Sequence, residues 1–149
     1  MLIALLVAAA LTAACCYVHL VVLRLLKRVV DAPRPMGHPL LFIILVLFAT
    51  HVFEVVLFAF ALSAPDWADY GRLEGAIVGG PGWFEDHFYF SIASYTTLGI
   101  GDIVPAGPIR IVAGMEALTG LVMVAWSASF TYLAMERLWT RTNSDAHKL

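Results

Sequence analysis

Three long apolar segments constrain this chain more than any other feature of its sequence. They cover roughly residues 2–23, 40–62 and 108–135. Each is long enough for a helix that crosses the hydrocarbon core of a membrane, which takes about 20 residues. Hydrophobic residues make up 61% of the 149 residues and the mean hydropathy is +0.86, which is far more than a small soluble core requires. We therefore predict an all-α integral membrane protein with three transmembrane helices.

A fourth apolar stretch, residues 84–97, is too short to cross a membrane, because a span takes about 20 residues. Backbone at membrane depth must have its polar groups satisfied, so a short segment of this kind enters and leaves on one side and is enclosed by protein. We predict a re-entrant helix between the second and third spans. The connection before it, from Asp66 to Trp83, contains the turn cluster GGPGW and is predicted to be a loop.

The distribution of charge predicts the orientation, because Lys and Arg are in excess in short cytoplasmic loops. Basic residues follow the first and the third span, whereas the charges between the second and third spans are mostly acidic. The basic residues are Arg24, Lys27, Arg28, Arg34, Arg137, Arg141 and Lys148. We therefore predict an N-terminus outside and a C-terminus in the cytoplasm, in the plasma (inner) membrane. The net charge of −2 offers no basic surface, so no nucleic-acid partner is expected.

The segment SYTTLGIGD, residues 94–102, directly follows the predicted re-entrant helix. If its successive carbonyl groups point to one side, alternate residues need opposite-handed backbone angles, which Gly99 and Gly101 adopt without steric cost. Such a column of oxygens replaces the water around a cation, with the Thr97 hydroxyl as a further ligand. One chain supplies one column, so we predict four copies around a common axis. The alternative is that the two glycines form an ordinary turn outside the membrane.

The stretch YFSIASYTTLGIGDIVP resembles the pore loop and selectivity filter of the tetrameric potassium channel family. Residues 97–102, TLGIGD, align with that family's T-V-G-Y-G-D, and the likeness extends over about residues 40–135. The resemblance implies a homotetramer in the lipid bilayer. It also implies a filter that binds K+, formed by Thr97, Leu98, Gly99, Ile100 and Gly101, with the ions held at the first four of these residues.

The predicted spans, the charges and the resemblance together predict a division of the chain. Residues 1–38 would form an N-terminal transmembrane helix and a basic cytoplasmic linker, and residues 139–149 a short cytoplasmic tail. Between them lies a pore domain, residues 39–138, with an outer helix (39–64), a pore helix (84–96), the filter (97–102) and an inner helix (108–138). The first helix lies outside the resemblance. We expect no organic cofactor and no soluble ligand-binding domain.

Two residues depart from the family pattern. Ile100 stands where the family usually has an aromatic ring that helps to hold the diameter of the filter, so here the brace must come from packing alone. Ala93 stands where some members carry a carboxylate on the pore helix, so Asp102 needs another partner, such as Arg110 of the same or the next subunit. The isoleucine motivates an alternative function, a weakly selective cation channel.

Ionisable residues within membrane spans are costly and by default indicate function. His51 and Glu54 lie in the second span and Glu116 in the third. We interpret them as a hydrogen-bonded cluster behind the filter, joined by Ser91 or Ser94 of the pore helix. One alternative is a helix-packing contact without a role in gating. The other is a divalent-metal site at His51, Glu54 and Glu116, which would make the chain an intramembrane metal-binding enzyme or accessory subunit.

The function that these observations favour is passive conduction of K+, and not catalysis. Besides the intramembrane residues, Thr96, Ser94 and Asp102 are expected to support the filter. Gly120, in the middle of the third span, is a candidate hinge, and a small residue at a helix contact is the equally expected alternative.

Overall fold

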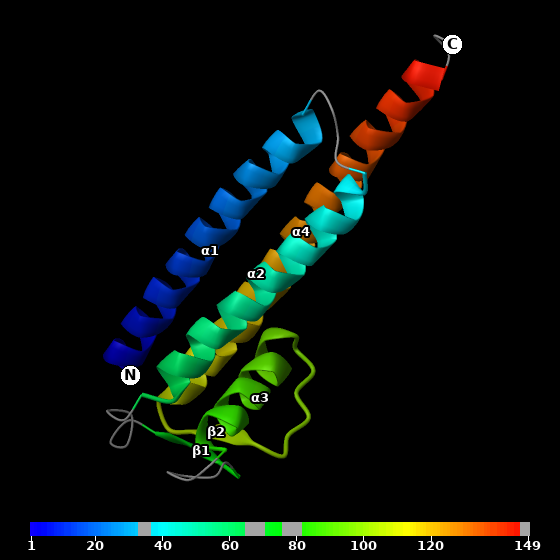
Figure 1. The fold of residues 1–149 in the computed structure, drawn as a ribbon. Coiled ribbons are helices and arrows are strands. Elements are labelled where there is room, and N and C mark those ends of the chain that lie inside the picture. The colour runs from blue at the N-terminus through cyan, green and yellow to red at the C-terminus, as the bar shows by residue number, and fades with distance from the viewer. Residues whose placement is uncertain (33–36, 65–70, 76–81, 147–149) are drawn as a thin grey trace.

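The computed structural model describes residues 1–32, 37–64, 71–75 and 82–146. Within these ranges three helices are long and apolar enough to cross a membrane: α1 (Leu2–Asp31), α2 (Pro39–Leu62) and the segment Ile109–Thr140 of α4 (Ile109–Ala146). Figure 1 shows the three side by side, with the N-terminus at one end of the bundle and the C-terminus at the other. The predicted class, an all-α membrane protein with three spans, is confirmed.

Helix α1 is longer than its apolar run alone suggests. It continues past residue 23 to Asp31, so Arg24, Lys27 and Arg28 lie on the helix and not in a linker. Straight-chain basic residues are good helix formers, and nothing interrupts them before Pro33. The residue that precedes a proline is pushed out of the helical region, and Ala32 is extended with ψ 138°. The predicted basic residue Arg34 lies outside the described residues.

Helix α2 begins at Pro39, the residue that the sequence predicts, because proline needs no hydrogen-bond partner in the first turn and its φ is already helical. It ends at Leu62, slightly before the predicted residue 64. The hydroxyl of Ser63 donates to the Phe60 carbonyl at 3.0 Å and helps to close the last turn.

Helix α4 begins at Ile109, directly after Pro108, and runs to Ala146, past the predicted end at residue 138. Its last turns contain neither proline nor glycine, so no residue in them ends the helix. Arg137 donates to the Asp31 carboxylate at 2.8 Å, which joins α4 to the end of α1. Of the predicted basic tail, Lys148 and the side chain of Arg141 lie outside the described part.

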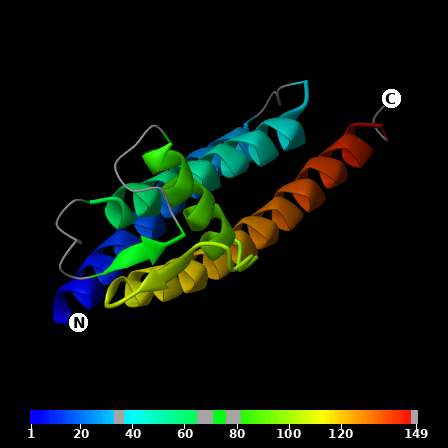
Figure 2. The same cartoon turned by 90° about the horizontal axis from the view of Figure 1, so that it is seen from below.

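The predicted re-entrant helix is α3 (Trp83–Tyr95). Its 13 residues correspond to about 20 Å, which is too short to cross a bilayer. It packs against both α2 and α4 at the end of the bundle where the N-terminus lies (Figure 2). After α3 the chain returns to that same end, so the segment enters and leaves on one side.

Two short strands, which the sequence did not predict, brace this end. Strand β1 (Arg72–Glu74) lies in the connection predicted to be a loop, and it pairs antiparallel with β2 (Val104–Ala106). Close approach of the two backbones explains Gly71, because a Cβ there would lie 2.1 Å from the Ala106 carbonyl oxygen. Leu73 of β1 is buried in the same apolar cluster as Ile109 of α4. Residues 66–70 and 76–81 of the predicted loop lie outside the described ranges.

One face of α1 is buried against α2 and α4. The buried residues recur at intervals of three, four or seven positions, as expected for one side of a helix. Several are small, which lets membrane helices approach closely. They are Ala4, Ala8, Cys15, His19, Leu23, Leu26 and Val30. The polar member of this stripe, His19, therefore faces the interior of the bundle.

Candidate functional site

The segment that follows α3 folds back on the helix it leaves. The Thr97 amide donates to the Ser94 carbonyl at 2.9 Å, and the amides of Leu98 and Gly99 both donate to the Ala93 carbonyl, at 2.9 and 3.2 Å. The C-terminal carbonyls of α3 are thereby partly satisfied, as a helix end requires. This tight turn fixes where the following residues begin.

Alternate residues of this segment have a left-handed backbone. Thr97 has φ +58°, Gly99 φ +56° and Gly101 φ +87°. The positive angles predicted for the two glycines are therefore found, and Thr97 extends the alternation by one position. Among the described residues, Thr97 is the only one other than glycine with a positive φ. A residue with a Cβ in that region costs about 1–3 kcal/mol and persists only where its surroundings enforce it.

A cavity of about 550 Å³ lies beside the segment. The segment lines it with Gly99, Ile100 and Gly101, and Ala93 of α3 and Gly114 of α4 line it from the helices. Ile100 is 54% exposed in the single chain. Within this chain, therefore, packing does not enclose the Ile100 side chain.

Asp102 finds its partner on α3. The Tyr89 hydroxyl donates to one oxygen of the Asp102 carboxylate at 2.9 Å, and the Ile103 amide donates to the other at 2.9 Å. The bond to the carboxylate raises the pKa of the Tyr89 phenol above its ordinary value. In the described part of the chain no ion pair joins Asp102 to Arg110. The sequence suggested Arg110 as the partner of Asp102 and did not predict Tyr89.

Two further hydroxyls predicted to support the filter bind backbone carbonyls. Ser94 donates to the Ala113 carbonyl at 2.9 Å and so joins α3 to α4. Thr96 donates to the Ile92 carbonyl at 2.7 Å in the last turn of α3. Both bonds fix the end of α3.

The intramembrane acids lie in two separate groups, and the predicted single cluster of His51, Glu54 and Glu116 is wrong. Glu116 accepts a hydrogen bond from Ser91 at 2.6 Å, and its second oxygen has no partner among the described residues. No hydrogen bond or ion pair between described residues joins this group to Glu54. Glu54 bonds instead to His19 of α1. The sequence did not predict where α1 packs.

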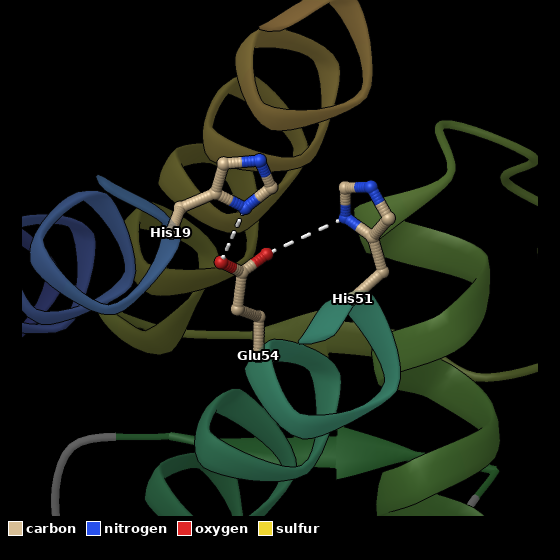
Figure 3. A group of neighbouring side chains, drawn as sticks. All are labelled: His19, His51 and Glu54. Atoms are coloured by element: carbon tan, nitrogen blue, oxygen red, sulfur yellow. Dashed lines mark hydrogen bonds and ion pairs between the residues drawn. The ribbon is translucent and has the colours of Figure 1, made fainter. Parts of the chain in front are cut away.

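Glu54 belongs to a group of five side chains that we call the Glu54 ring: Glu54 and His51 of α2, His19 of α1, Tyr95 of α3 and Ser127 of α4. Figure 3 shows the two histidines on either side of the carboxylate. His19 Nδ1 lies 3.0 Å from one Glu54 oxygen, and the Tyr95 hydroxyl donates to the other.

The remaining contacts of the Glu54 ring involve His51 and Ser127. Its Nδ1 lies 2.9 Å from the Tyr95 hydroxyl and its Nε2 lies 3.1 Å from the Ser127 hydroxyl. The Ser127 hydroxyl is also 3.0 Å from His19 Nε2. Sequence reasoning missed His19, Tyr95 and Ser127. His19 could have been identified from the sequence, because it is a titratable residue on a helix face with several small residues.

The ring contains ligand types that suit a divalent ion, since ligand atoms of His19, His51 and Glu54 lie within 4.8 Å of one another. The metal site suggested from the sequence required Glu116, which binds Ser91 instead. Every imidazole nitrogen and carboxylate oxygen of the three residues already has a hydrogen-bond partner inside the Glu54 ring. Hydrogen bonds therefore account for the arrangement without an ion.

Gly120 lies where α4 passes the end of α3. A Cβ at this position would lie 2.0 Å from the Tyr95 carbonyl oxygen, far inside van der Waals contact. Gly120 is therefore required for close packing of the two helices. This supports the packing interpretation of the two offered by the sequence.

Comparison with known proteins covers α2 through most of α4. A family model described as "Ion channel" matches residues 40–137, so α1 lies outside the match. The inward rectifier potassium channel Kirbac3.1 of Paramagnetospirillum magnetotacticum is 38% identical over 58 residues, which are 38% of this chain and 20% of that protein. The aligned part thus spans about one fifth of the length of that relative. No solved structure matches the chain.

Proposed function

Since the chain belongs to the ion channel family, and is not an enzyme, we propose that it conducts K+ passively across a membrane through a filter formed by residues 97–101. The observation that carries the proposal is the alternation of positive φ at Thr97, Gly99 and Gly101. This is the backbone pattern that a column of carbonyl oxygens requires, and such a column replaces the hydration shell of an alkali ion.

In this proposal the ions are held by the oxygens of Thr97, Leu98, Gly99 and Ile100. Helix α3 ends at Tyr95, just before the filter. The partial negative charge at a helix C-terminus favours a cation, so the short helix serves the same purpose as the carbonyl column. The K+ named in the description of the Kirbac3.1 relative supports this choice of ion.

A single chain supplies a single column, and a dehydrated ion must be surrounded. We therefore propose a homotetramer with the filter segments around its axis. Leu98 and Ile100 are 65% and 54% exposed in the single chain. Neighbouring chains would cover them.

A second candidate function is a weakly selective cation channel, and Ile100 favours it. The side chain has no polar atom, so it cannot be anchored by a hydrogen bond, and it borders a cavity of about 550 Å³. The filter is held instead at its two ends, by the bond from Tyr89 to Asp102 and by the bonds at the end of α3. We propose that these bonds keep the filter narrow enough for selection of K+.

Filter support is proposed for Asp102, Thr96, Ser94, Glu54, His51 and Glu116, on the hydrogen bonds described above. Bending of α4 at Gly120 remains a proposal beside its role in packing. The orientation is likewise proposed: the end with the filter and the N-terminus outside, and the basic C-terminal end in the cytoplasm of a plasma (inner) membrane.

Ion flux through the purified full-length chain in liposomes tests the function. We expect K+ flux to exceed Na+ flux and to be blocked by Ba2+. Gly99→Ala should abolish K+ flux, because alanine at a positive φ costs about 1–2 kcal/mol. No atom within 4 Å would obstruct the added Cβ. The effect would thus be on backbone conformation and not on packing.

Gly114→Ala is the matched control, since it also adds a methyl group in open space but on helical backbone. It should leave the flux unchanged. Equal permeability to K+ and Na+ would select the weakly selective channel. Absence of flux in the wild type, or a purified protein that is monomeric, would overturn the proposal.

A further inference from the structure

The hydrogen bonds of the Glu54 ring form a closed cycle. They lead from Glu54 to Tyr95, to His51, to Ser127, to His19 and back to Glu54. In this cycle each residue is hydrogen-bonded to two others, and all four helices contribute at least one member. His51 Nδ1 also lies 3.5 Å from the Glu54 oxygen to which Tyr95 donates (Figure 3). Removal of any member therefore opens the whole cycle.

The number of hydrogens in the ring follows from its contacts. Each of the five contacts requires one hydrogen. Tyr95 donates to Glu54; when Ser127 likewise donates within the ring, the two imidazoles and the Glu54 carboxyl share three. Either Glu54 is protonated between two neutral histidines, or it is ionised and one histidine is protonated. Both arrangements have no net charge.

With both hydroxyl hydrogens inside the cycle, the cycle is complete only in this neutral state. With one hydrogen fewer, one contact joins two acceptors, and with one more, a contact holds two hydrogens. Neutrality explains how three ionisable side chains lie within the spans of a membrane protein, where a net charge is costly. A polar network in which every member is satisfied also fixes the positions of its members.

The ring holds the residue from which the filter begins. Tyr95 is the last residue of α3, two positions before Thr97, and is 2% exposed. Its hydroxyl contacts both Glu54 and His51 of α2, and its carbonyl lies where Gly120 of α4 leaves room for it. The position of Thr97 is therefore set through Tyr95.

His19 connects α1 to this arrangement. It is fully buried, and the ring of Trp126 stacks on it with centroids 5.6 Å apart. Among the described residues it is the one member of the ring from α1, and it precedes the segment that matches the channel family. A helix outside the family's pore domain thus completes the polar network inside it.

We propose that His19 and Ser127 are positioning residues of the filter. By closing the Glu54 ring they fix Tyr95, and α1 is thereby part of the filter's support. This inference rests on the proposed channel function. It adds to that function a role for α1 and two residues that do not touch the ion.

Recordings from the purified full-length chain in planar bilayers test the proposal, with the K+ to Na+ permeability ratio and the unitary K+ conductance as readouts. His19→Leu leaves one buried oxygen of Glu54 without its partner and removes one of the two partners of the Ser127 hydroxyl. We expect the permeability ratio to fall about tenfold, within the range that unpaired buried polar groups produce. Ser127→Ala, which removes a single oxygen, should lower the ratio in the same direction.

Two comparisons separate positioning from stability. Thr12→Val breaks another hydrogen bond between α1 and α4, the 2.9 Å contact of Thr12 with Thr119, which lies outside the ring. It should leave the ratio unchanged. Glu54→Gln keeps a group that both donates and accepts, so its ratio should stay near that of the wild type, whereas Glu54→Leu should resemble His19→Leu.

The members of a closed cycle act together, so the double variant His19→Leu/Ser127→Ala should lower the ratio little more than either single variant. Should His19→Leu not assemble, Ser127→Ala decides the question. A conducting wild type with unchanged readouts in Ser127→Ala, or an equal fall in Thr12→Val, would overturn the role of the ring alone. A wild type without conduction would instead overturn the channel function.

Discussion

The filter segment begins two residues after Tyr95, whose hydroxyl lies in the buried Glu54 ring. At the other end of the segment, Asp102 accepts a hydrogen bond from Tyr89, which is 37% exposed. The same chemical group, a tyrosine hydroxyl bonded to a carboxyl group, thus appears at both ends. At the first end four helices enclose it, and at the second end the short β1–β2 pair and α3 lie beside open space.

The comparison shows that burial, and not the kind of bond, decides how much such a contact contributes. A buried acceptor that loses its donor keeps the full penalty of desolvation, whereas an exposed one turns to water. We therefore expect the filter to be held rigidly next to α3 and more adaptably next to β2. Three substitutions test this difference, in order of decreasing effect.

Gly120→Ala should have the largest effect. The added methyl group would lie 2.0 Å from the backbone oxygen of Tyr95, so the end of α3 must move. We expect a loss of unfolding free energy at the upper end of about 1–3 kcal/mol. The better helix propensity of alanine offsets only about 1 kcal/mol of this loss. Denaturant titration in detergent measures it.

Gly114→Ala provides the control for that experiment, because a Cβ at Gly114 meets no atom within 4 Å. It should raise the unfolding free energy by up to about 1 kcal/mol. If both alanines stabilise the protein equally, the close contact between Gly120 and Tyr95 does not exist in solution.

Tyr95→Phe should have an intermediate effect. It removes only the hydroxyl, but the Glu54 oxygen and the His51 Nδ1 that contact it then lose a partner inside the bundle. We expect a loss of about 1–2 kcal/mol of unfolding free energy, measured in the same titration, together with a lower K+ to Na+ permeability ratio. Unchanged stability would mean that water or another group replaces the hydroxyl.

Tyr89→Phe makes the identical change at the other end and should have the smallest effect. Asp102 keeps the bond from the Ile103 amide, and water reaches the exposed site, so stability should not change measurably. A spectroscopic pH titration checks the bond itself. The neighbouring carboxylate raises the pKa of Tyr89. The absorbance change that is present in the wild type and absent from Tyr89→Phe should therefore occur above the pH at which a free tyrosine titrates.

The titration of Tyr89 also makes its hydrogen bond to Asp102 pH-dependent. The hydrogen bond from the neutral phenol is present below its raised pKa and is lost as the pH rises through that value. In Asp102→Asn the pKa of Tyr89 should fall toward its ordinary value. A phenol that titrates normally in the wild type would contradict the bond between Tyr89 and Asp102.

The sequence predicts the elements that depend on local pattern. Length and apolarity identify three spans and a helix too short to cross, and the motif at residues 97–102 indicates the ion channel family, which is confirmed. The positive φ of Gly99 and Gly101 was likewise predictable, because it follows from the geometry of a carbonyl column.

What the sequence did not predict depends on how helices face one another. Glu54 and Glu116 were expected in one cluster, but the first bonds to His19 of α1 and the second to Ser91 of α3. Apolar residues surround α1 on all sides, so hydropathy does not identify its packed face. The pairing of β1 with β2 was missed because strands of three residues carry almost no periodic signal.

The five hydrogens of the Glu54 ring have a consequence for how the protein responds to an electric field. A net charge that moves across a membrane changes its energy by about 2.3 kcal/mol for each 100 mV, but the ring that holds both hydroxyl hydrogens has none. Although it contains a carboxyl group and two imidazoles, transmembrane voltage therefore exerts no net force on it. The support of the filter next to α3 should accordingly be the same at resting and at depolarised potentials.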